Sequence, residues 1–366
     1  MKVVYILPTY NERANIASML EALLKIFKKI PQYDAQILVI DDNSPDGTGE
    51  LVKQYSKKHP SIHLMTGPKK GLGFAYIRGM KYAVNELKAD IFFEIDSDLS
   101  HNPKLIPSFL KEIEKGADLV IGSRYIKGGS IPQEWAWQRK VFSIFGNLIA
   151  RFGLMIPRVH EWSSGYRAIK TEVFKKVGAD LDKYTGYTFQ IAFLHRTIQA
   201  GFKVVEIPLN FIDRKHGKSK FIPLDYITNV LLYIFSNSSF IRFCLVGMVG
   251  FVINLIGLEV FYRLGISPGT AAALGAEFAI ISNFLFNNFW AFAHKKIKKD
   301  ENIFKKFLQF NTVSIGAVII QFIIVSLGTS IFGDQTRFIF LVLAVGAFII
   351  PYSYFMYNRF IWKTRH

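Results

Sequence analysis

Two aspartates separated by one residue, Asp96 and Asp98, are the side chains that most directly suggest chemistry. They follow Ile91-Phe92-Phe93-Glu94-Ile95, a run rich in Ile and Phe that predicts a short buried strand. Carboxylates at the carboxyl end of such a strand in an open α/β sheet face the crevice where ligands bind. Their oxygens suit Mg²⁺ or Mn²⁺ and, through the metal, a diphosphate. The pattern also fits a helix cap, with Asp98 or Ser100 preceding a helix near Pro103.

The surrounding chain alternates strands with helices, which is typical of a mainly parallel, doubly wound α/β sheet. We expect strands at 2–7, 35–40, 62–65, 91–95, 118–121 and 203–207, and helices at 14–29, 75–87, 104–115, 138–155 and 189–200. Tyr10 and Glu12 follow the first strand, and Asp41 and Asp42 end the second. Because parallel strands end at one edge of the sheet, the sequence predicts an acidic edge that faces a ligand.

A glycine-rich stretch, Gly71-Leu72-Gly73, resembles a phosphate-binding loop. It fails the dinucleotide pattern because Tyr76 stands where a third glycine is required. We therefore expect a flexible loop near the site rather than a cofactor fingerprint.

The composition divides the chain near residue 239. Half of the 366 residues are hydrophobic, 15% are aromatic and the mean hydropathy is +0.22, which is high for an ordinary soluble protein. Residues 1–239 carry 33 Lys and Arg against 23 Asp and Glu, whereas residues 240–366 carry 12 and 5. Four stretches reach the roughly 20 residues that cross a bilayer: 243–262, 269–293, 307–333 and 338–358. We expect a membrane part of four transmembrane helices.

The basic residues indicate orientation. Six lysines lie between the second and third stretches, and more basic residues follow the fourth, while the other loops hold little charge. Since basic loops stay in the cytoplasm, both termini and the amino-terminal part are expected there, and Met1 leads straight into a strand without a signal peptide. The single cysteine, Cys244, allows no intrachain disulfide. Three polar residues lie within the four apolar stretches: Glu259, Glu277 and Asn283. Such residues serve either as functional groups or as contacts between helices.

The net charge of +17 fits anionic partners. A nucleic acid is not expected, because no basic-aromatic binding motif occurs, and the neighbouring membrane explains the charge better. A helix over 221–236 has the apolar face of a helix that lies on a bilayer.

The membrane part also contains a candidate repeat. Phe240-Ile241-Arg242-Phe243 resembles Phe307-Leu308-Gln309-Phe310, and Asn288-x-x-x-Phe292 resembles Asn358-x-x-x-Trp362. A duplicated helical hairpin in parallel orientation fits both matches.

Motifs along residues 1–225 together resemble a family 2 glycosyltransferase of GT-A fold, in its dolichyl- or polyprenyl-phosphate mannose synthase subgroup. They keep the order of that family: Pro8-Thr9-Tyr10-Asn11-Glu12, Asp41-Asp42-Asn43-Ser44-Pro45-Asp46, Gly71-Leu72-Gly73, Asp96-Ser97-Asp98-Leu99-Ser100-His101, Gly122-Ser123-Arg124-Tyr125, Ser164-Gly165-Tyr166-Arg167 and Asp213-Arg214 with Gly217-x-Ser219-Lys220. The family triplet is commonly Asp-Ala-Asp, and Ser97 replaces the alanine here. The membrane part resembles a GtrA-like domain. The resemblance implies three regions: a catalytic domain over 1–220, an interface helix over 221–238 and a four-helix membrane domain over 239–366.

The resemblance also implies roles. Nucleotide-sugar binding falls to Pro8, Tyr10, Glu12, Asp41, Asp42, Asp96 and Ser97, with Mg²⁺ or Mn²⁺ on Asp96 and Asp98. The catalytic residues would be Asp98, Arg124 and Arg139, and the acceptor phosphate would meet Arg124, Arg139, Ser164, Arg214 and Lys220. An ionised lipid phosphate needs placement rather than a strong base, and guanidinium groups suit that task. The basic residues could instead form a solvated face, and Asp41 could serve a turn.

The implied reaction is inverting transfer of mannose from GDP-mannose to dolichyl or polyprenyl phosphate at the bilayer, and an oligomer through the membrane part is a further expectation. A processive polysaccharide synthase is disfavoured, because its Gln-x-x-Arg-Trp pattern does not occur. Two alternatives stay open: a UDP-glucose donor with the same acceptor, and a non-catalytic lipid-sugar flippase or scaffold built on the membrane part.

Overall fold

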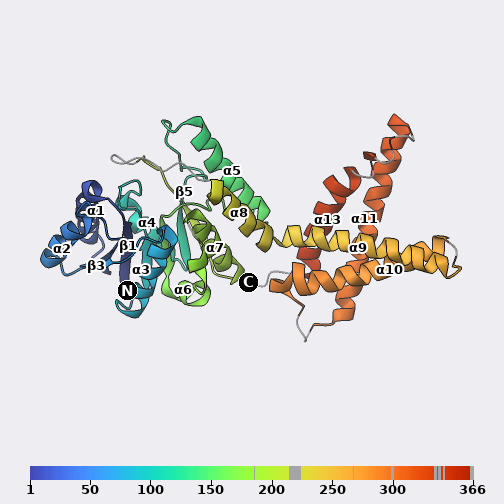
Figure 1. Ribbon diagram of the computed structural model, residues 1–366, viewed down its shortest axis with the longest axis horizontal. Coiled ribbons are helices and arrows are strands. Elements are labelled where there is room, and N and C mark those ends of the chain that lie inside the picture. Colours follow the sequence, from blue (N-terminus) through green and yellow to red (C-terminus); the bar gives the residue numbers. More distant parts are fainter. Residues whose placement is uncertain are drawn as a thin grey trace. The chain divides into compact units, whose positions relative to one another are not determined.

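The computed structural model describes residues 1–184, 186–213, 224–266, 268–297, 301–333, 336, 339–340 and 343–362. It divides the chain into two compact units, Met1–Asn237 and Ser238–His366 (Figure 1). We call them the catalytic unit and the membrane unit after the roles that the sequence resemblance implies, and each is described by itself.

The catalytic unit contains a seven-stranded sheet in the order β3-β2-β1-β4-β6-β5-β7. Its strands are β1 (Lys2–Thr9), β2 (Asp34–Asp41), β3 (Ile62–Thr66), β4 (Ile91–Glu94), β5 (Leu119–Ser123), β6 (Arg167–Lys170) and β7 (Val204–Pro208). All pairings are parallel except those of β6, which runs antiparallel to β4 and β5. The expected mainly parallel α/β sheet is confirmed, and β6 is a strand that is absent from those expected from the sequence.

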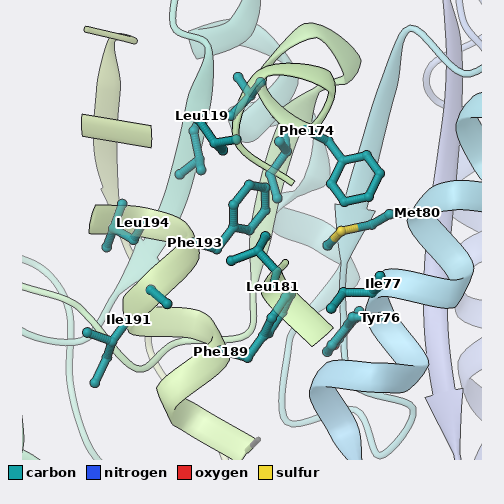
Figure 2. Packing of buried hydrophobic residues seen from close by; sticks show 14 of the residues in the cluster. Tyr76, Ile77, Met80, Leu119, Phe174, Leu181, Phe189, Ile191, Phe193 and Leu194 are labelled. Carbon is teal, nitrogen blue, oxygen red and sulfur yellow. The ribbon is translucent and has the colours of Figure 1, made fainter. Parts of the chain in front are cut away.

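Helices cover both faces of the sheet. They are α1 (Arg13–Phe27), α2 (Thr48–Lys58), α3 (Leu72–Asn85), α4 (Ile106–Glu114), α5 (Trp137–Gly153), α6 (Thr171–Val177), α7 (Gly186–Gln199) and α8 (Leu224–Asn237), with 3-10 turns at Pro103–Leu105 and Leu181–Lys183. Strand residues alternate between two buried clusters, as the period of two requires. One cluster joins the sheet to α3, α6, α7 and α8, and the other joins it to α1, α2 and α4. Figure 2 shows part of the first cluster, where Phe189 and Phe193 of α7 meet Tyr76 and Met80 of α3.

Helix α8 belongs to the catalytic unit. Its Val230, Tyr233 and Ile234 are buried, and the Tyr233 hydroxyl lies 2.9 Å from Nδ1 of His195 on α7. Beside it, α5 ends at Gly153, where Ile234 leaves no room for a Cβ atom. The other face of α8 exposes Leu231, Leu232 and Phe235. The expected amphipathic helix over 221–236 is therefore present from Leu224, and residues 221–223 lie outside the described part of the chain.

The membrane unit is helical, with α9 (Ser239–Arg263), α10 (Pro268–Phe286), α11 (Ile303–Phe332) and α13 (Ile350–Met356). Single π-helical turns continue α10 at Asn287–Ala291 and flank α13 at Ala344–Ile349 and Tyr357–Ile361, and a 3-10 turn covers Ala293–Lys295. Among the described residues, one helix, Ser239–Phe261, is long and apolar enough to cross a membrane. The exact number of four crossings stays a prediction.

The candidate repeat appears in the contacts of the membrane unit. Arg242, at the start of α9, donates to the carbonyl of Trp290, while Lys306, at the start of α11, donates to that of Phe360, the counterpart of Trp290. The two asparagines accept across the repeats. Asn288 accepts from Nε1 of Trp362, and Asn358 accepts from Nζ of Lys295. Each repeat thus ends in a π-helical turn whose asparagine binds the other repeat.

We predict that Asn288→Ala destabilises the membrane unit. Its side-chain oxygen also accepts from the backbone N–H of Ile297, so the change leaves two buried donors without an acceptor. The expected cost is about 1–3 kcal/mol of unfolding free energy. Thermal unfolding of the full chain in detergent measures it, with Thr312→Ala, an exposed hydroxyl on α11, as the control. Equal melting temperatures of the two variants would contradict the role of Asn288.

Candidate active site

The ends of β1 and β2 lie side by side at one edge of the sheet, with Thr9 in register with Asp41. The Asp41 carboxylate is buried and accepts three hydrogen bonds, from the Thr9 hydroxyl at 2.9 Å, from the Ser44 hydroxyl at 2.6 Å and from the Ser44 N–H at 2.9 Å. These bonds fix the turn after β2, so the turn role considered for Asp41 is present in the structure.

Asp42 is the second carboxylate of this turn, and it faces a cation. Nη2 of Arg78, from α3, lies 3.0 Å from its Oδ1 atom. Burial raises the pKa of Asp42, and Arg78 opposes that rise. Arg78 packs against Gly67, where any Cβ would collide with its guanidinium. Within the described residues, its buried Nε and Nη1 atoms have no hydrogen-bond partner. The Arg78 guanidinium, with only some of its N–H groups hydrogen-bonded, therefore lies beside a carboxylate at the end of β2.

The remaining predicted nucleotide residues lie around the same edge. Pro8 is in register with Ile40, one residue before the end of each strand. The Tyr10 ring is exposed, and the ammonium group of Lys69 lies 3.4 Å from its centroid. Glu12 precedes α1 and accepts from the Asn15 amide at 2.7 Å. The edge thus presents an aromatic face, carboxylates and cations together.

The Asp96-Ser97-Asp98 triplet follows β4, which pairs with β1. Nδ1 of His101 accepts from the Asp96 N–H at 3.1 Å, and its buried ring stacks on Tyr166. The Ser100 N–H donates to Asp98 Oδ1 at 3.0 Å, so Asp98 closes a tight turn. His101 is therefore a structural support of the triplet.

This turn fits a divalent cation. The Asp96 side chain is 38% exposed, whereas Asp98 and Ser97 are buried. The Ser100 hydroxyl is also buried, and it has no hydrogen-bond partner within the described residues. Mg²⁺ is usually held by one or two carboxylates together with substrate phosphates, so two aspartates suffice. No cluster of three His, Cys, Asp or Glu that could hold a metal occurs in the described part of the chain.

A buried ion pair lies behind the triplet. Glu94, the last residue of β4, is fully buried, and its Oε2 atom lies 3.9 Å from Nε of Arg167 on β6. Burial raises the pKa of Glu94 to about 7, an effect that Arg167 opposes. Arg167 also donates to the carbonyls of Gln190 and Trp162, which ties β6 to α7 and to the 157–166 loop. This pair stiffens the strand end that carries Asp96.

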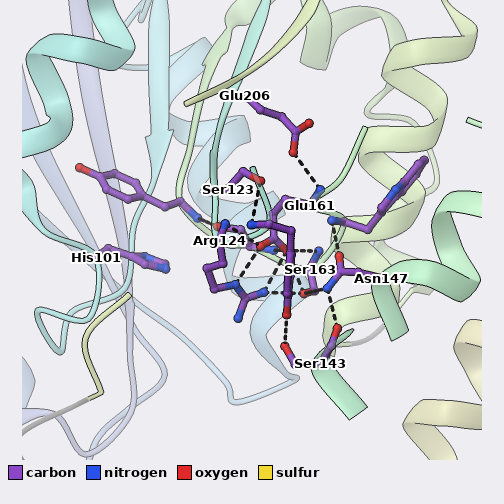
Figure 3. A network of polar contacts seen from close by, with 12 residues as sticks. His101, Ser123, Arg124, Ser143, Asn147, Glu161, Ser163 and Glu206 are labelled. Carbon is purple, nitrogen blue, oxygen red and sulfur yellow. Dashed lines mark hydrogen bonds and ion pairs between the residues drawn. The ribbon is translucent and has the colours of Figure 1, made fainter. Parts of the chain in front are cut away.

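Arg124 follows β5 and is held by a buried carboxylate, as Figure 3 shows. Its Nε and Nη2 atoms donate to Oε2 and Oε1 of Glu161 at 2.8 and 2.9 Å, and Nη2 also donates to the Ser163 hydroxyl. Burial alone would raise the pKa of Glu161, but the Arg124 charge and its hydrogen bonds lower it. The bidentate geometry fixes the direction of the guanidinium plane.

The loop around Glu161 is anchored from two sides. Glu206, on β7, accepts from the backbone N–H groups of His160 and Glu161 at 3.0 and 2.9 Å (Figure 3). Asn147, on α5, accepts from the Trp162 N–H at 2.6 Å and donates to the Ser163 hydroxyl. Arg124 is therefore oriented by groups from a strand, a helix and a loop.

The other predicted acceptor residues are placed separately. Arg139, on α5, pairs with Asp213 at 3.0 Å and lies over the Trp135 ring at 3.8 Å. Ser164 is buried; its N–H donates to Glu161, and its hydroxyl accepts from the Tyr166 N–H. Arg214 and Lys220 lie outside the described residues.

An apolar surface adjoins these residues. Helix α5 carries Arg139 in its first turn, and along its length it exposes eight large apolar side chains: Trp137, Val141, Phe142, Ile144, Phe145, Leu148, Ile149 and Phe152. Exposed apolar surface of this extent marks an interaction with a membrane or a partner. The sequence reading gave this role to residues 221–238 and missed it for α5.

Comparison with known proteins gives the family. Residues 5–178 match glycosyl transferase family 2, and residues 242–362 match the GtrA/DPMS transmembrane domain. A protein of Pyrococcus furiosus named dolichol-phosphate mannosyltransferase is 33% identical over 331 residues, which cover 88% of this chain and 90% of that protein. This chain belongs to the dolichol-phosphate mannosyltransferase family. It is a membrane-bound glycosyltransferase with a GT-A-like catalytic unit and a GtrA/DPMS helical unit.

Other relatives match the catalytic unit of this glycosyltransferase. Polyprenol monophosphomannose synthase of Mycolicibacterium smegmatis is 38% identical over 221 residues, 60% of this chain and 80% of that protein. Undecaprenyl-phosphate mannosyltransferase of Micrococcus luteus is 37% identical, again over 60% of this chain and 87% of that protein. Glucosyl-3-phosphoglycerate synthase of Mycobacterium tuberculosis has a TM-score of 0.44 at 19% identity, over 64% of this chain and 77% of that structure. That last likeness is too low to bear on function.

Sequence reasoning missed several residues of the glycosyltransferase site. Arg78 reads as one polar position of an amphipathic helix, although a buried carboxylate at a strand end calls for a partner. Glu161 gave even less signal, because its contact with Arg124 spans 37 residues of sequence.

Proposed function

We propose that this enzyme transfers mannose from GDP-mannose to dolichyl or polyprenyl phosphate, with inversion at the sugar carbon. The observation that supports the proposal is the shared edge of β1, β2 and β4: the Asp96/Asp98 turn and the Asp42–Arg78 pair follow the two strands that flank β1. Both features belong to a chain that matches 90% of the length of a relative, and that relative is named for dolichol phosphate and mannose.

The nucleotide would lie across the ends of β1 and β2. Guanine offers two N–H donors next to a carbonyl acceptor on one edge. The Asp42 carboxylate suits the donors, and the unsatisfied N–H groups of Arg78 suit the acceptor. Uracil carries an oxygen where guanine carries its amino group, so the same carboxylate would repel it. This arrangement supports a GDP-sugar over UDP-glucose.

The diphosphate would lie over the triplet. Asp96 and Asp98 would hold Mg²⁺ or Mn²⁺, and a bound ion supplies Lewis-acid stabilisation of the departing diphosphate. Asp96 is the more exposed carboxylate and faces the ligand, while Asp98 is fixed by its turn. Ser97 is small and buried, as the alanine of the common Asp-Ala-Asp pattern would be. The substitution is therefore compatible with metal binding by this turn.

The acceptor phosphate would be placed by arginines. Arg124 presents a guanidinium whose direction is fixed by Glu161, and Arg139 stands at the start of the apolar face of α5. A lipid phosphate is ionised at neutral pH, so these residues need only orient it in line with the sugar carbon. Arg139 pairs with Asp213 and would exchange that carboxylate for the acceptor phosphate. We assign Ser164 to the backbone support of this loop, and Arg214 and Lys220 to closure over the acceptor.

The lipid chain would remain in the bilayer. The exposed apolar residues of α5 and α8 support a catalytic unit that rests on the membrane surface. The four apolar stretches and the basic loops support a multi-pass protein with its catalytic unit and both termini in the cytoplasm. We retain the three regions 1–220, 221–238 and 239–366 as functional parts, and association through the membrane unit as a further proposal.

We predict that Asp42→Asn weakens binding of GDP-mannose, because the amide offers one acceptor where the carboxylate offers two. KM for GDP-mannose should rise by roughly tenfold, with a smaller effect on kcat. Arg78→Leu should act in the same direction. Asp46→Asn, which alters a carboxylate that accepts hydrogen bonds from Thr48 at the start of α2, is the control for changes in the 41–48 turn. An unchanged KM in Asp42→Asn would contradict base recognition by Asp42.

The proposal is tested by incubating the full chain in detergent with dolichyl phosphate and labelled GDP-mannose or UDP-glucose, in Mn²⁺, in Mg²⁺ and in EDTA. We expect metal-dependent mannose transfer to the lipid. Glucose transfer alone would keep the mechanism and replace the donor. No transfer from either donor by folded protein would contradict the proposal and favour the flippase or scaffold alternative.

A further inference from the structure

A buried carboxamide lies beside the triplet without a settled partner. Gln190, on α7, is 1% exposed, and neither its Oε1 nor its Nε2 atom has a hydrogen-bond partner within the described residues. Its side chain faces Glu94, and this approach lowers the pKa of Glu94 without forming a hydrogen bond of standard geometry. A buried amide without a standard hydrogen bond is unfavourable, so it calls for an explanation.

Next to this amide, Gly165 leaves room for one Cβ atom. A Cβ atom built on Gly165 would have Asp96 Oδ1 at 3.8 Å, Gln190 Nε2 at 3.8 Å and His101 Cε1 at 3.7 Å. These are the nearest atoms, so nothing else fills that point. Gly165 does not have a left-handed φ, which means that its backbone would accept a side chain. Backbone strain therefore does not require glycine at position 165, and the gap exists because this residue has no side chain.

Asp96 of the triplet borders the same gap. That side chain is 38% exposed, yet its Oδ1 atom bounds the buried gap and lies 3.4 Å from the Tyr76 hydroxyl. A ligand group that entered beside Asp96 would meet a carboxylate acceptor on one side and an amide donor on the other. A neutral hydroxyl, which both donates and accepts, satisfies this pair without adding charge.

We propose that Gln190 determines sugar specificity by hydrogen bonding one hydroxyl of the donor hexose, which enters the gap at Gly165. This inference rests on the proposed function, since the hexose is that of the nucleotide sugar. A site built to hydrogen bond a hydroxyl rejects an analogue that lacks it, because the buried polar group is then left unpaired.

The test compares GDP-mannose with its monodeoxy analogues as donors to dolichyl phosphate, using the full chain in detergent. Wild type should discriminate against one deoxy donor by about tenfold to a hundredfold in kcat/KM. Gln190→Leu should lose about that factor with GDP-mannose and lose nothing with that one deoxy donor. Inhibition by GDP alone should be unchanged, because the nucleotide does not reach Gln190.

A second variant guards against misfolding. Gly165→Ala leaves Gln190 in place and fills the gap, and it should reproduce the selective loss with GDP-mannose. Equal losses for all donors, or weaker inhibition by GDP, would show that Gln190 is only structural. No change in either variant would show that the gap holds nothing, or water. Wild type that transfers no hexose would contradict the proposed function, whereas an active wild type with an unaltered deoxy pattern in Gln190→Leu overturns this inference alone.

Discussion

Replacing Asp98 with alanine is expected to remove mannose transfer while leaving the catalytic unit folded. Asp98 is the buried carboxylate of the triplet, and its hydrogen bond to the Ser100 N–H shapes the turn that would hold the metal. Loss of Lewis-acid stabilisation worth several kcal/mol corresponds to a fall of about 10³-fold or more in kcat. Initial rates at saturating GDP-mannose and Mn²⁺ measure this effect.

Two controls separate the metal from the fold. Asp98→Asn retains the turn but removes the charge, so it should lose nearly as much activity as alanine. Asp90→Asn alters an exposed carboxylate at the opposite end of the same strand, and its rate should stay near wild type. If Asp98→Asn kept full activity, and EDTA had no effect on wild type, the metal role of the triplet would be wrong.

The second large effect is expected at Glu161, which is fully buried under Arg124. Glu161→Ala leaves an almost buried guanidinium without its carboxylate, and it also frees the N–H groups of Ser163 and Ser164. Breaking such a pair costs about 3–5 kcal/mol of unfolding free energy. Denaturant unfolding of the full chain should show a destabilisation of that size, and transfer should fall with it.

The milder Glu161→Gln separates orientation from stability. Its amide can accept only one of the two Arg124 hydrogen bonds. We therefore expect a clear fall in kcat and a smaller loss of unfolding free energy than in Glu161→Ala. Glu172→Gln, whose side chain is 63% exposed, is the matched control and should change neither property. A Glu161→Gln enzyme that turned over like wild type would contradict the view that Glu161 positions Arg124.

Much of this fold was accessible from local sequence pattern. Each of the strands β1 to β4 is a short apolar run, and the polar residues that end them converge because parallel strands share an edge. Strand β6 escaped, because its four residues include Arg167 and its pairing with β4 joins positions far apart in sequence. A buried arginine in a strand is understandable only once Glu94 is known to lie opposite.

The candidate site divides in the same way. Asp96, Asp98 and Arg124 were predicted from the sequence because they sit in short motifs that keep their order along the chain. Arg78, Glu161 and Gln190 were not, since each acts on a residue brought near by folding, and no spacing rule connects them. The asparagines at 288 and 358 were noticed as a repeat in the sequence, and the structure adds that each accepts a hydrogen bond from a residue near the end of the other repeat.

The most direct test of the central claim is the identity of the lipid product. The purified full chain would be incubated with dolichyl phosphate, GDP-mannose that carries an isotopically heavy sugar, and unlabelled UDP-glucose. The mass of the extracted lipid would then be measured by mass spectrometry. We predict dolichyl phosphate heavier by one labelled hexose, formed with Mn²⁺ and absent with EDTA. A product that carried the light hexose, or unmodified lipid from folded enzyme, would contradict mannose transfer from GDP-mannose.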